Sequence, residues 1–187
     1  MSRLSAILAA ATLSLAAATL SPAARADDHA MMMEGGSATI GDLQLTGAWT
    51  RATPPAARAG GGYLKITNNG SKTDYLVSGS VDFAERVEIH EMSVINDVMK
   101  MRHLEDGLPV PPGETVALEP GSYHVMFMGM TEPLTEGKAV DVTLTFRNAG
   151  DVTIKMPVAK VGARSLSGKD GGAMQHDHGQ MDMQKSE

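Results

Sequence analysis

Strict two-residue alternation near the C-terminal end of the central region restricts the fold more than any other feature. The stretches VDVTLTF (140–146) and DVTIKMPV (151–158) each place an apolar residue at every second position. The inward-facing residues are Val140, Val142, Leu144, Phe146, Val152, Ile154, Met156 and Val158. A period of two is that of a β-strand with one buried face, and the intervening NAG at 148–150 predicts a hairpin.

The rest of the central region also has the pattern of short β-strands. Further strands are predicted at Leu43–Thr50, Gly62–Asn68, Tyr75–Val81, Arg86–Met92, Val98–His103, Thr115–Glu119 and Ser122–Met128. The turn signals NNGSK, PPGE and EPG fall between them, and TPPAARAGGG (53–62) is interpreted as a loop. Eight or nine short strands without an amphipathic helix predict an all-β fold, an antiparallel β-sandwich or barrel.

Residues 1–26 have the pattern of a secretory signal peptide. Arg3 supplies a positive start, an apolar and small-residue run follows, and AARA offers a cleavage site after Ala26. An uncleaved signal anchor is the alternative. No other segment approaches the ~20 apolar residues needed to span a bilayer, so we expect an exported, periplasmic protein without stable membrane insertion.

Charge and cysteine content exclude several classes of function. Removal of residues 1–26 deletes two arginines and no acid, which takes the formal net charge from −6 to −8. An acidic chain argues against nucleic-acid binding. The 187 residues contain no cysteine, which excludes disulfides, thiolate catalysis and blue copper.

The two ends of the mature chain are polar and Gly-rich. Residues 27–40, which are rich in Met, and residues 162–187, which are rich in Met and His, show no period that could bury a face. We expect both to be flexible tails around a folded domain at 41–161.

Histidine and methionine occur together in the central region. Its three histidines lie in or beside Met-containing strands, in the stretches IHEM, VMKMRH and YHVMFMGM. Residues two apart on a strand share a face, so His124 is expected beside Met126. Neutral imidazole and thioether ligands suit Cu(I). The alternative is structural, because Met is an adaptable core residue.

The stretch VEIHEMSVINDVMKMRHLEDGLPVPPGETVALEPGSYHVMFMGM closely resembles the PCu(A)C family of periplasmic copper chaperones. The family signature is a His, a Met about eleven residues later and a distant His-x-Met. It falls on His90, Met101, His124 and Met126, with Met101 to His124 about one residue longer than the pattern. The resemblance covers about 40–160, including AWTRATPPAARAGGGYLKITN. It implies a cupredoxin-like fold that binds one Cu(I) and delivers it to the binuclear copper centre of cytochrome c oxidase subunit II.

Residues around the signature have other expected roles. Met99 shares the face of Met101 and is an alternative ligand, whereas His103 is expected to be exposed. Glu91 should point to the opposite, solvated face, and Trp49 should be a core residue. The remaining methionines are expected to form an apolar shell around the metal: Met92, Met128 and Met130.

Both tails carry possible copper ligands. In MQHDHGQMDM the candidates are Met174, His176, His178, Met181 and Met183, although a merely solubilising tail is the alternative. Cleavage after Ala26 would expose Asp27, Asp28 and His29. A free amine, two amides and the imidazole would then form a square-planar Cu(II) site, which a cut after Ala24 would destroy.

The function expected from these observations is copper binding and transfer rather than catalysis. The chain has no evident Ser/His/Asp or paired-carboxylate arrangement, and a thioether-rich site disfavours redox cycling. Partners would be the oxidase subunit and other periplasmic copper carriers. Copper sequestration for tolerance, without a dedicated acceptor, is the alternative function.

Overall fold

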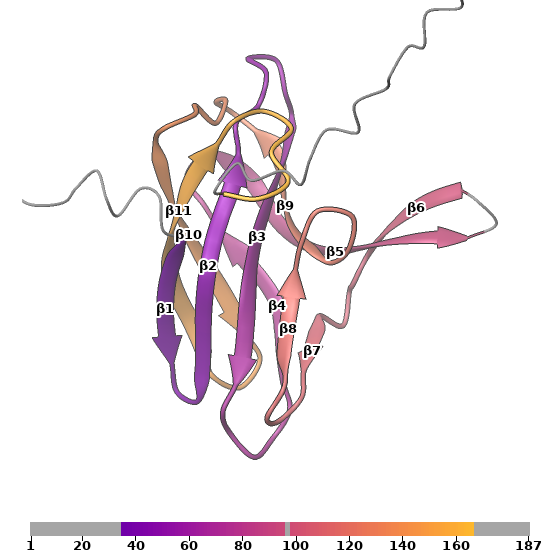
Figure 1. Ribbon diagram of the computed structural model, residues 1–187, viewed down its shortest axis with the longest axis vertical. Coiled ribbons are helices and arrows are strands. Elements are labelled where there is room, and N and C mark those ends of the chain that lie inside the picture. Colours follow the sequence, from indigo (N-terminus) through magenta and orange to yellow (C-terminus); the bar gives the residue numbers. More distant parts are fainter. Residues whose placement is uncertain (1–34, 96–97, 167–187) are drawn as a thin grey trace, which may run out of the picture.

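The computed structural model describes residues 35–95 and 98–166, and in this part the chain forms strands and no helix. The strands, shown in Figure 1, are β1 Gly36–Ile40, β2 Leu43–Arg51, β3 Ala59–Asn68, β4 Asp74–Ser80, β5 Ala84–Ile95, β6 Val98–His103, β7 Leu108–Val110, β8 Thr115–Leu118, β9 His124–Met130, β10 Ala139–Phe146 and β11 Gly150–Ala159. No helix able to cross a membrane is found among these residues.

Seven of the strands close into a barrel. The order is β2-β11-β10-β4-β5-β9-β3, and the ring closes because β3 also pairs with β2. Strands β1, β6, β7 and β8 attach to this ring as additional pairs. The predicted all-β fold is confirmed. One pairing differs from the antiparallel expectation, since β2 and β11 run parallel through Thr50 and Val158.

The predicted hairpin is also present. Strands β10 and β11 pair antiparallel, with Val142 opposite Ile154 and Leu144 opposite Val152. Val142, Leu144 and Ile154 are buried in the main core. The apolar residues of the alternating pattern therefore lie on the inner face of the barrel wall.

The loop predicted at 53–62 was too long, because its last four residues begin β3. Gly60 and Gly62 lie opposite Phe127 and Val125 of β9. A Cβ added at Gly62 would lie 3.1 Å from Cζ of Phe127, so the glycine lets the two strands pack closely. A glycine run therefore marks a close strand contact here rather than a loop.

Two predicted tail boundaries also need correction. Residues 36–40, assigned to the N-terminal tail, form β1 on the edge of β2. At the other end, Ala163 is buried against Trp49 and Tyr63. Trp49 is buried as expected, but in this small cluster apart from the main core.

The signal peptide, the Asp27–His29 site and the tail residues 174–183 lie outside the described residues.

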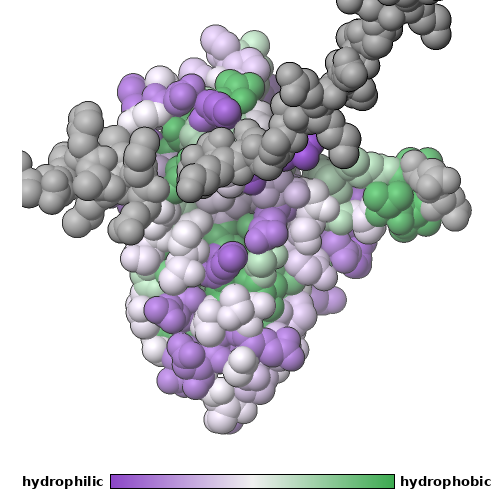
Figure 2. Space-filling model, viewed as in Figure 1, coloured by the Kyte–Doolittle hydropathy of each residue, from purple (hydrophilic) through white to green (hydrophobic). Residues whose placement is uncertain are grey.

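A two-stranded ribbon projects from the barrel (Figure 1). Strand β5 pairs with β9 as far as His90, and from His90 to Ile95 it pairs with β6. Figure 2 shows hydrophobic atoms gathered on this ribbon. The exposed apolar side chains there are Val94, Ile95, Val98, Met99 and Met101.

Candidate metal site

The predicted metal ligands come together where β9, β5 and β6 run side by side. His90 of β5 lies directly opposite His124 of β9 and directly opposite His103 of β6. The ring centroids are 5.8 Å apart for His90 and His124, and 5.5 Å apart for His90 and His103. Directly opposed residues share one face of a sheet, so the three imidazoles form a row across it.

Methionines flank this row of imidazoles on both sides. Met126 lies opposite Glu88, one step along the same face, and Met101 lies opposite Met92 on the ribbon. Residues two apart on a strand share a face. Two thioether sulfurs predicted as ligands therefore bracket the pair of histidines.

A pocket of about 270 Å³ opens at this position. Three of the four predicted ligands, Met101, His124 and Met126, line it together with Met92. His90 is outside that lining but is joined to His124 by the cross-strand pairing. The two histidines are nearly buried, at 9% and 5% exposure, whereas Met101 is 48% exposed. The site thus has a buried nitrogen side and an accessible sulfur side.

A backbone carbonyl fixes the tautomer of His124. Its Nδ1 lies 3.0 Å from the carbonyl oxygen of Ser122. A carbonyl only accepts, so Nδ1 carries the proton and the lone pair is left on Nε2. Burial lowers the pKa of His124 below its ordinary value, although the bond to Ser122 acts in the opposite direction. The ring is therefore held neutral with one nitrogen free to bind a metal.

The same carbonyl also ties the ribbon to β9. The backbone N–H of Met92 donates to the Ser122 oxygen at 3.2 Å. One oxygen atom therefore holds the base of the ribbon and the ring of His124 together.

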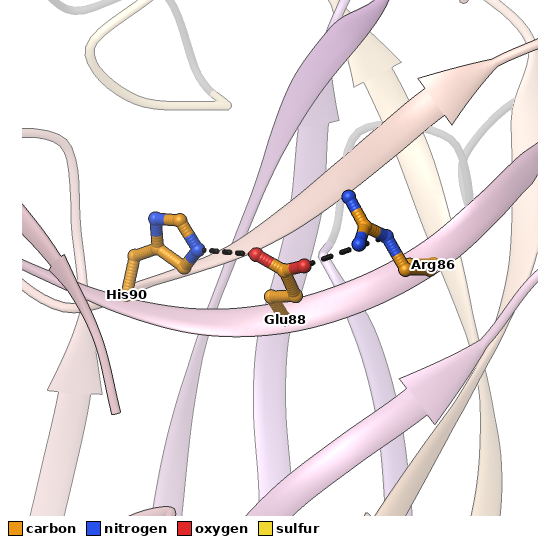
Figure 3. A network of polar contacts seen from close by, with 3 residues as sticks. All are labelled: Arg86, Glu88 and His90. Atoms are coloured by element: carbon orange, nitrogen blue, oxygen red, sulfur yellow. Dashed lines mark hydrogen bonds and ion pairs between the residues drawn. The ribbon is translucent and has the colours of Figure 1, made fainter. Parts of the chain in front are cut away.

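A carboxylate orients His90 in the opposite sense. Nε2 of His90 lies 2.9 Å from Oε2 of Glu88, and Nε of Arg86 lies 3.6 Å from Oε1 (Figure 3). The hydrogen bond from His90 lowers the pKa of Glu88, against an opposing effect of burial, so the carboxylate is charged and accepts. In the neutral ring, Nε2 then carries the proton and Nδ1 holds the lone pair. That Nδ1 is buried and has no hydrogen-bond partner among the described residues.

An unpaired buried nitrogen is costly, by about 1–3 kcal/mol, unless something binds it. The orphaned Nδ1 of His90 is such an atom, and Nε2 of His124 holds the second free lone pair on the neighbouring strand. Both rings donate their other N–H to a fixed acceptor, which is the arrangement found for metal-ligating histidines. The donor set fits a metal ion bound between them.

A glycine leaves room on the β3 side of the pocket. Gly61 lies opposite Met126, and a Cβ added there would lie 2.9 Å from the hydroxyl of Tyr63. Gly61 and Tyr63 both line the pocket. The glycine therefore leaves room for the Tyr63 hydroxyl in the wall of the pocket.

The composition of the site selects the class of metal. Across residues 35–95 and 98–166, no group of three or more His, Cys, Asp or Glu side chains is placed to hold a metal ion. Among the described residues, the further soft donors beside His90 and His124 are the methionines that line the pocket. Thioether and imidazole suit Cu(I), whereas Mg²⁺, Ca²⁺ and Mn²⁺ prefer oxygen ligands.

Other predicted roles have mixed outcomes. Glu91 does lie on the opposite face, paired with Arg102 at 2.6 Å, and His103 is exposed beside His90. Met130 is not part of a shell around the site, because it is 2% exposed in the barrel core. Met128 lies on the site face, opposite Arg86 and Ala59.

The residues that orient the two histidines, Glu88 and Ser122, were not among the predicted site residues. Glu88 precedes His90 by two positions, and this spacing places it on the same face of a strand. Ser122 acts through its backbone oxygen, which leaves no signal in the side-chain pattern.

A family model described as "Putative lipoprotein LpqE-like" matches residues 43–158. A curated protein of Leifsonia xyli subsp. xyli, "Putative lipoprotein Lxx21020", is 32% identical over 116 residues, which cover 62% of this chain and 69% of that protein. The family match spans the barrel strands except the last residue of β11, and it includes every residue of the candidate site.

Solved structures with the same fold are PCuAC domains and a copper protein. The apo PCuAC domain from PmoF1 is 25% identical, covers 66% of this chain and 98% of its own, and has a TM-score of 0.56. The Cu(I) form of DR1885 from Deinococcus radiodurans is 26% identical, covers 67% of this chain and 81% of its own, and has a TM-score of 0.50. The copper-bound PCuAC domain from PmoF2, at 24% identity and a TM-score of 0.56, shares the fold.

We predict opposite tautomers for the two central histidines in the metal-free protein. Nitrogen-15 NMR, at a pH where both rings are neutral, should find His124 protonated at Nδ1 and His90 protonated at Nε2. In Glu88→Ala, His90 should lose its single tautomer while His124 keeps its own. If both rings of the wild type are mixtures, the hydrogen bonds do not control which lone pair is free.

Proposed function

We propose that this chain, which belongs to the LpqE-like family, is an exported copper chaperone of the PCuAC type. The observation that carries the proposal is the pair of opposed histidines, each with one fixed N–H and one free lone pair, beside methionines in one pocket. Copper is the cargo, held as Cu(I). The proposed ligands are His90, Met101, His124 and Met126.

The proposed site would hold Cu(I) in preference to other ions because every ligand is neutral and two are soft. Thioethers need no deprotonation, so binding releases no proton from Met101 or Met126. Burial lowers the pKa of His124, so a proton competes less with copper for its imidazole nitrogen. A hard divalent cation should bind this site weakly, because the proposed ligands are neutral and include no carboxylate oxygen.

Release of copper would proceed by exchange of ligands. The imidazoles are buried, while Met101 is about half exposed. An acceptor can therefore displace the thioether first and leave both nitrogens bound, so that one bond breaks as another forms. No electron moves, because copper stays Cu(I) throughout. This function is non-enzymatic.

The acceptor that we propose is the binuclear copper centre of cytochrome c oxidase subunit II, with other exported copper carriers as further partners. This proposal rests on the resemblance to the PCu(A)C signature at His90, Met101, His124 and Met126. Sequestration of copper for tolerance is the competing function, because a high-affinity Cu(I) site would serve either purpose.

We further propose that the C-terminal Met and His residues form a second copper site. The described chain ends beside the core site: Nε of Arg51 donates to the carbonyl oxygen of Ala163 at 2.6 Å. Arg51, Pro120 and Gly121 line both the candidate pocket and a neighbouring pocket that includes Leu166. His176 lies ten residues beyond Leu166, and ten residues span at most about 33–36 Å. A tail attached there would raise the local concentration of copper at the core site.

Export is supported by the signal-peptide pattern and by the lipoprotein description of the family. We propose a periplasmic location with cleavage after Ala26, which would create the Asp27–His29 site for Cu(II). The described relatives are named lipoproteins, but these 187 residues contain no cysteine to carry a thioether-linked lipid.

Substitution of the core ligands should abolish tight Cu(I) binding. In an anaerobic titration against a competing chelator, His124→Ala and Met126→Leu should each weaken the affinity of the core site more than Glu88→Gln does. Glu88 acts only through His90, and loss of such a partner costs about 10–100-fold. Met128→Leu, on the same strand and face as Met126, is the matched control and should bind as the wild type does.

Tail variants separate the terminal sites from the core in the same titration. Replacement of His176 and His178 by Ala, with the three tail methionines changed to Leu, should lower the number of ions bound and preserve the tightest Cu(I) affinity. His29→Ala should remove one Cu(II) ion detected by visible absorption. Loss of tight Cu(I) binding in the tail variant alone, with intact binding in His124→Ala, would place the site in the tail.

Deletion of the gene distinguishes delivery from storage. We expect loss of cytochrome c oxidase activity at limiting copper, restored by added copper and by a plasmid-borne wild-type gene but not by the His124→Ala gene at limiting copper. Copper sensitivity with normal oxidase activity would instead support sequestration.

A further inference from the structure

The β5–β6 ribbon has two chemically different faces. One carries Glu91 opposite Arg102 and Ser93 opposite Lys100, and is charged and polar near the barrel. The other continues the face of the candidate site outward. Its opposed pairs, from the barrel to the tip, are His90 with His103, Met92 with Met101, and Val94 with Met99. Soft ligands are thus confined to one face of the ribbon.

Met99 lies on this face beyond the pocket. It is 66% exposed and two positions from Met101, which is about 6.6–6.8 Å along a strand. Met101 lines the pocket and Met99 does not. A thioether side chain has three rotatable bonds, so the sulfurs of neighbouring methionines on one face can approach a common ion.

Packing does not account for an exposed Met at this position. The ribbon beyond His90 is two-stranded, and such a ribbon is only marginally stable in water. Met99 buries little surface in it, and its cross-strand neighbour Val94 is itself 68% exposed. Figure 2 shows the apolar atoms of the ribbon open to solvent. A residue that adds little to burial there is available for another role.

We propose that Met99 is the outer ligand of a copper transfer path that runs along the ribbon into the site, through Met101. The proposal rests on the proposed Cu(I) function. In each step, one copper–sulfur bond forms to the next thioether as one copper–ligand bond breaks behind it. Thioethers carry no proton and copper stays Cu(I), so neither protons nor electrons are exchanged. Met99 binds the ion only in transit.

A transit ligand has a kinetic signature that a resident ligand lacks. Removal of Met99 should slow both entry and exit of copper and leave the equilibrium affinity unchanged, because the resting site keeps its own ligands. Removal of Met101 should instead weaken the affinity. The comparison of rates with affinities therefore separates the two roles.

The experiment uses the full chain loaded with Cu(I) under anaerobic conditions. Stopped-flow absorbance follows copper transfer to the chelator bathocuproine disulfonate, and competition at equilibrium gives the affinity. Met99→Leu should slow transfer by about tenfold, equivalent to ~1.4 kcal/mol in the barrier, with affinity within about twofold of wild type. Leucine retains the apolar surface, so only the sulfur is removed. Val94→Leu, directly opposite on the same face, is the matched control and should transfer at the wild-type rate.

Three results would overturn the proposal. Transfer from Met99→Leu at the wild-type rate would show that the sulfur has no part in exchange. An affinity lowered as much as in Met101→Leu would make Met99 a resident ligand. Equal slowing in Val94→Leu would assign the effect to the apolar surface of the ribbon. If the wild type itself binds no Cu(I) tightly, the proposed function fails instead.

Discussion

The register between β5 and β9 is the constraint on which the site depends. Ile89 lies opposite Val125 and both are fully buried, so the next pair along, His90 and His124, must face away from the core. A slip of one residue would move the buried set to the outer face and both imidazoles into the barrel, at the cost of the core. Hydrophobic packing on one face therefore fixes the ligand positions on the other.

Two acceptors then determine which nitrogen each imidazole offers. The carbonyl of Ser122 and the carboxylate of Glu88 bind opposite nitrogens of His124 and His90, so one ring presents Nε2 and the other Nδ1. Ser122 also accepts from the backbone of the ribbon, which brings Met101 to the same pocket. The nitrogen donors are buried on the barrel strands, and one of the two sulfurs, that of Met101, is exposed on the projecting ribbon.

The sequence predicted the elements of this arrangement better than the contacts between them. Period-two alternation placed Val142, Leu144 and Ile154 inside and His124 on the same face as Met126, because a strand face is a local property. The parallel closure of β2 on β11 and the close approach of β3 to Phe127 depend on partners distant in sequence, so the stretch 53–62, with glycines at 60–62, is predicted as a loop instead. The hydrogen bond from His90 to Glu88 could not be predicted from their two-residue spacing alone, because it also depends on the strand geometry.

X-ray absorption spectroscopy can show whether one Cu(I) ion is held by two imidazoles and two thioethers. The sample is the full chain with its C-terminal Met and His residues replaced, loaded with one equivalent of Cu(I). The proposed site predicts two nitrogen and two sulfur scatterers, with one sulfur lost in Met126→Leu and one nitrogen lost in His124→Ala. A copper ion without sulfur, or one whose spectrum is unchanged by both substitutions, would contradict it.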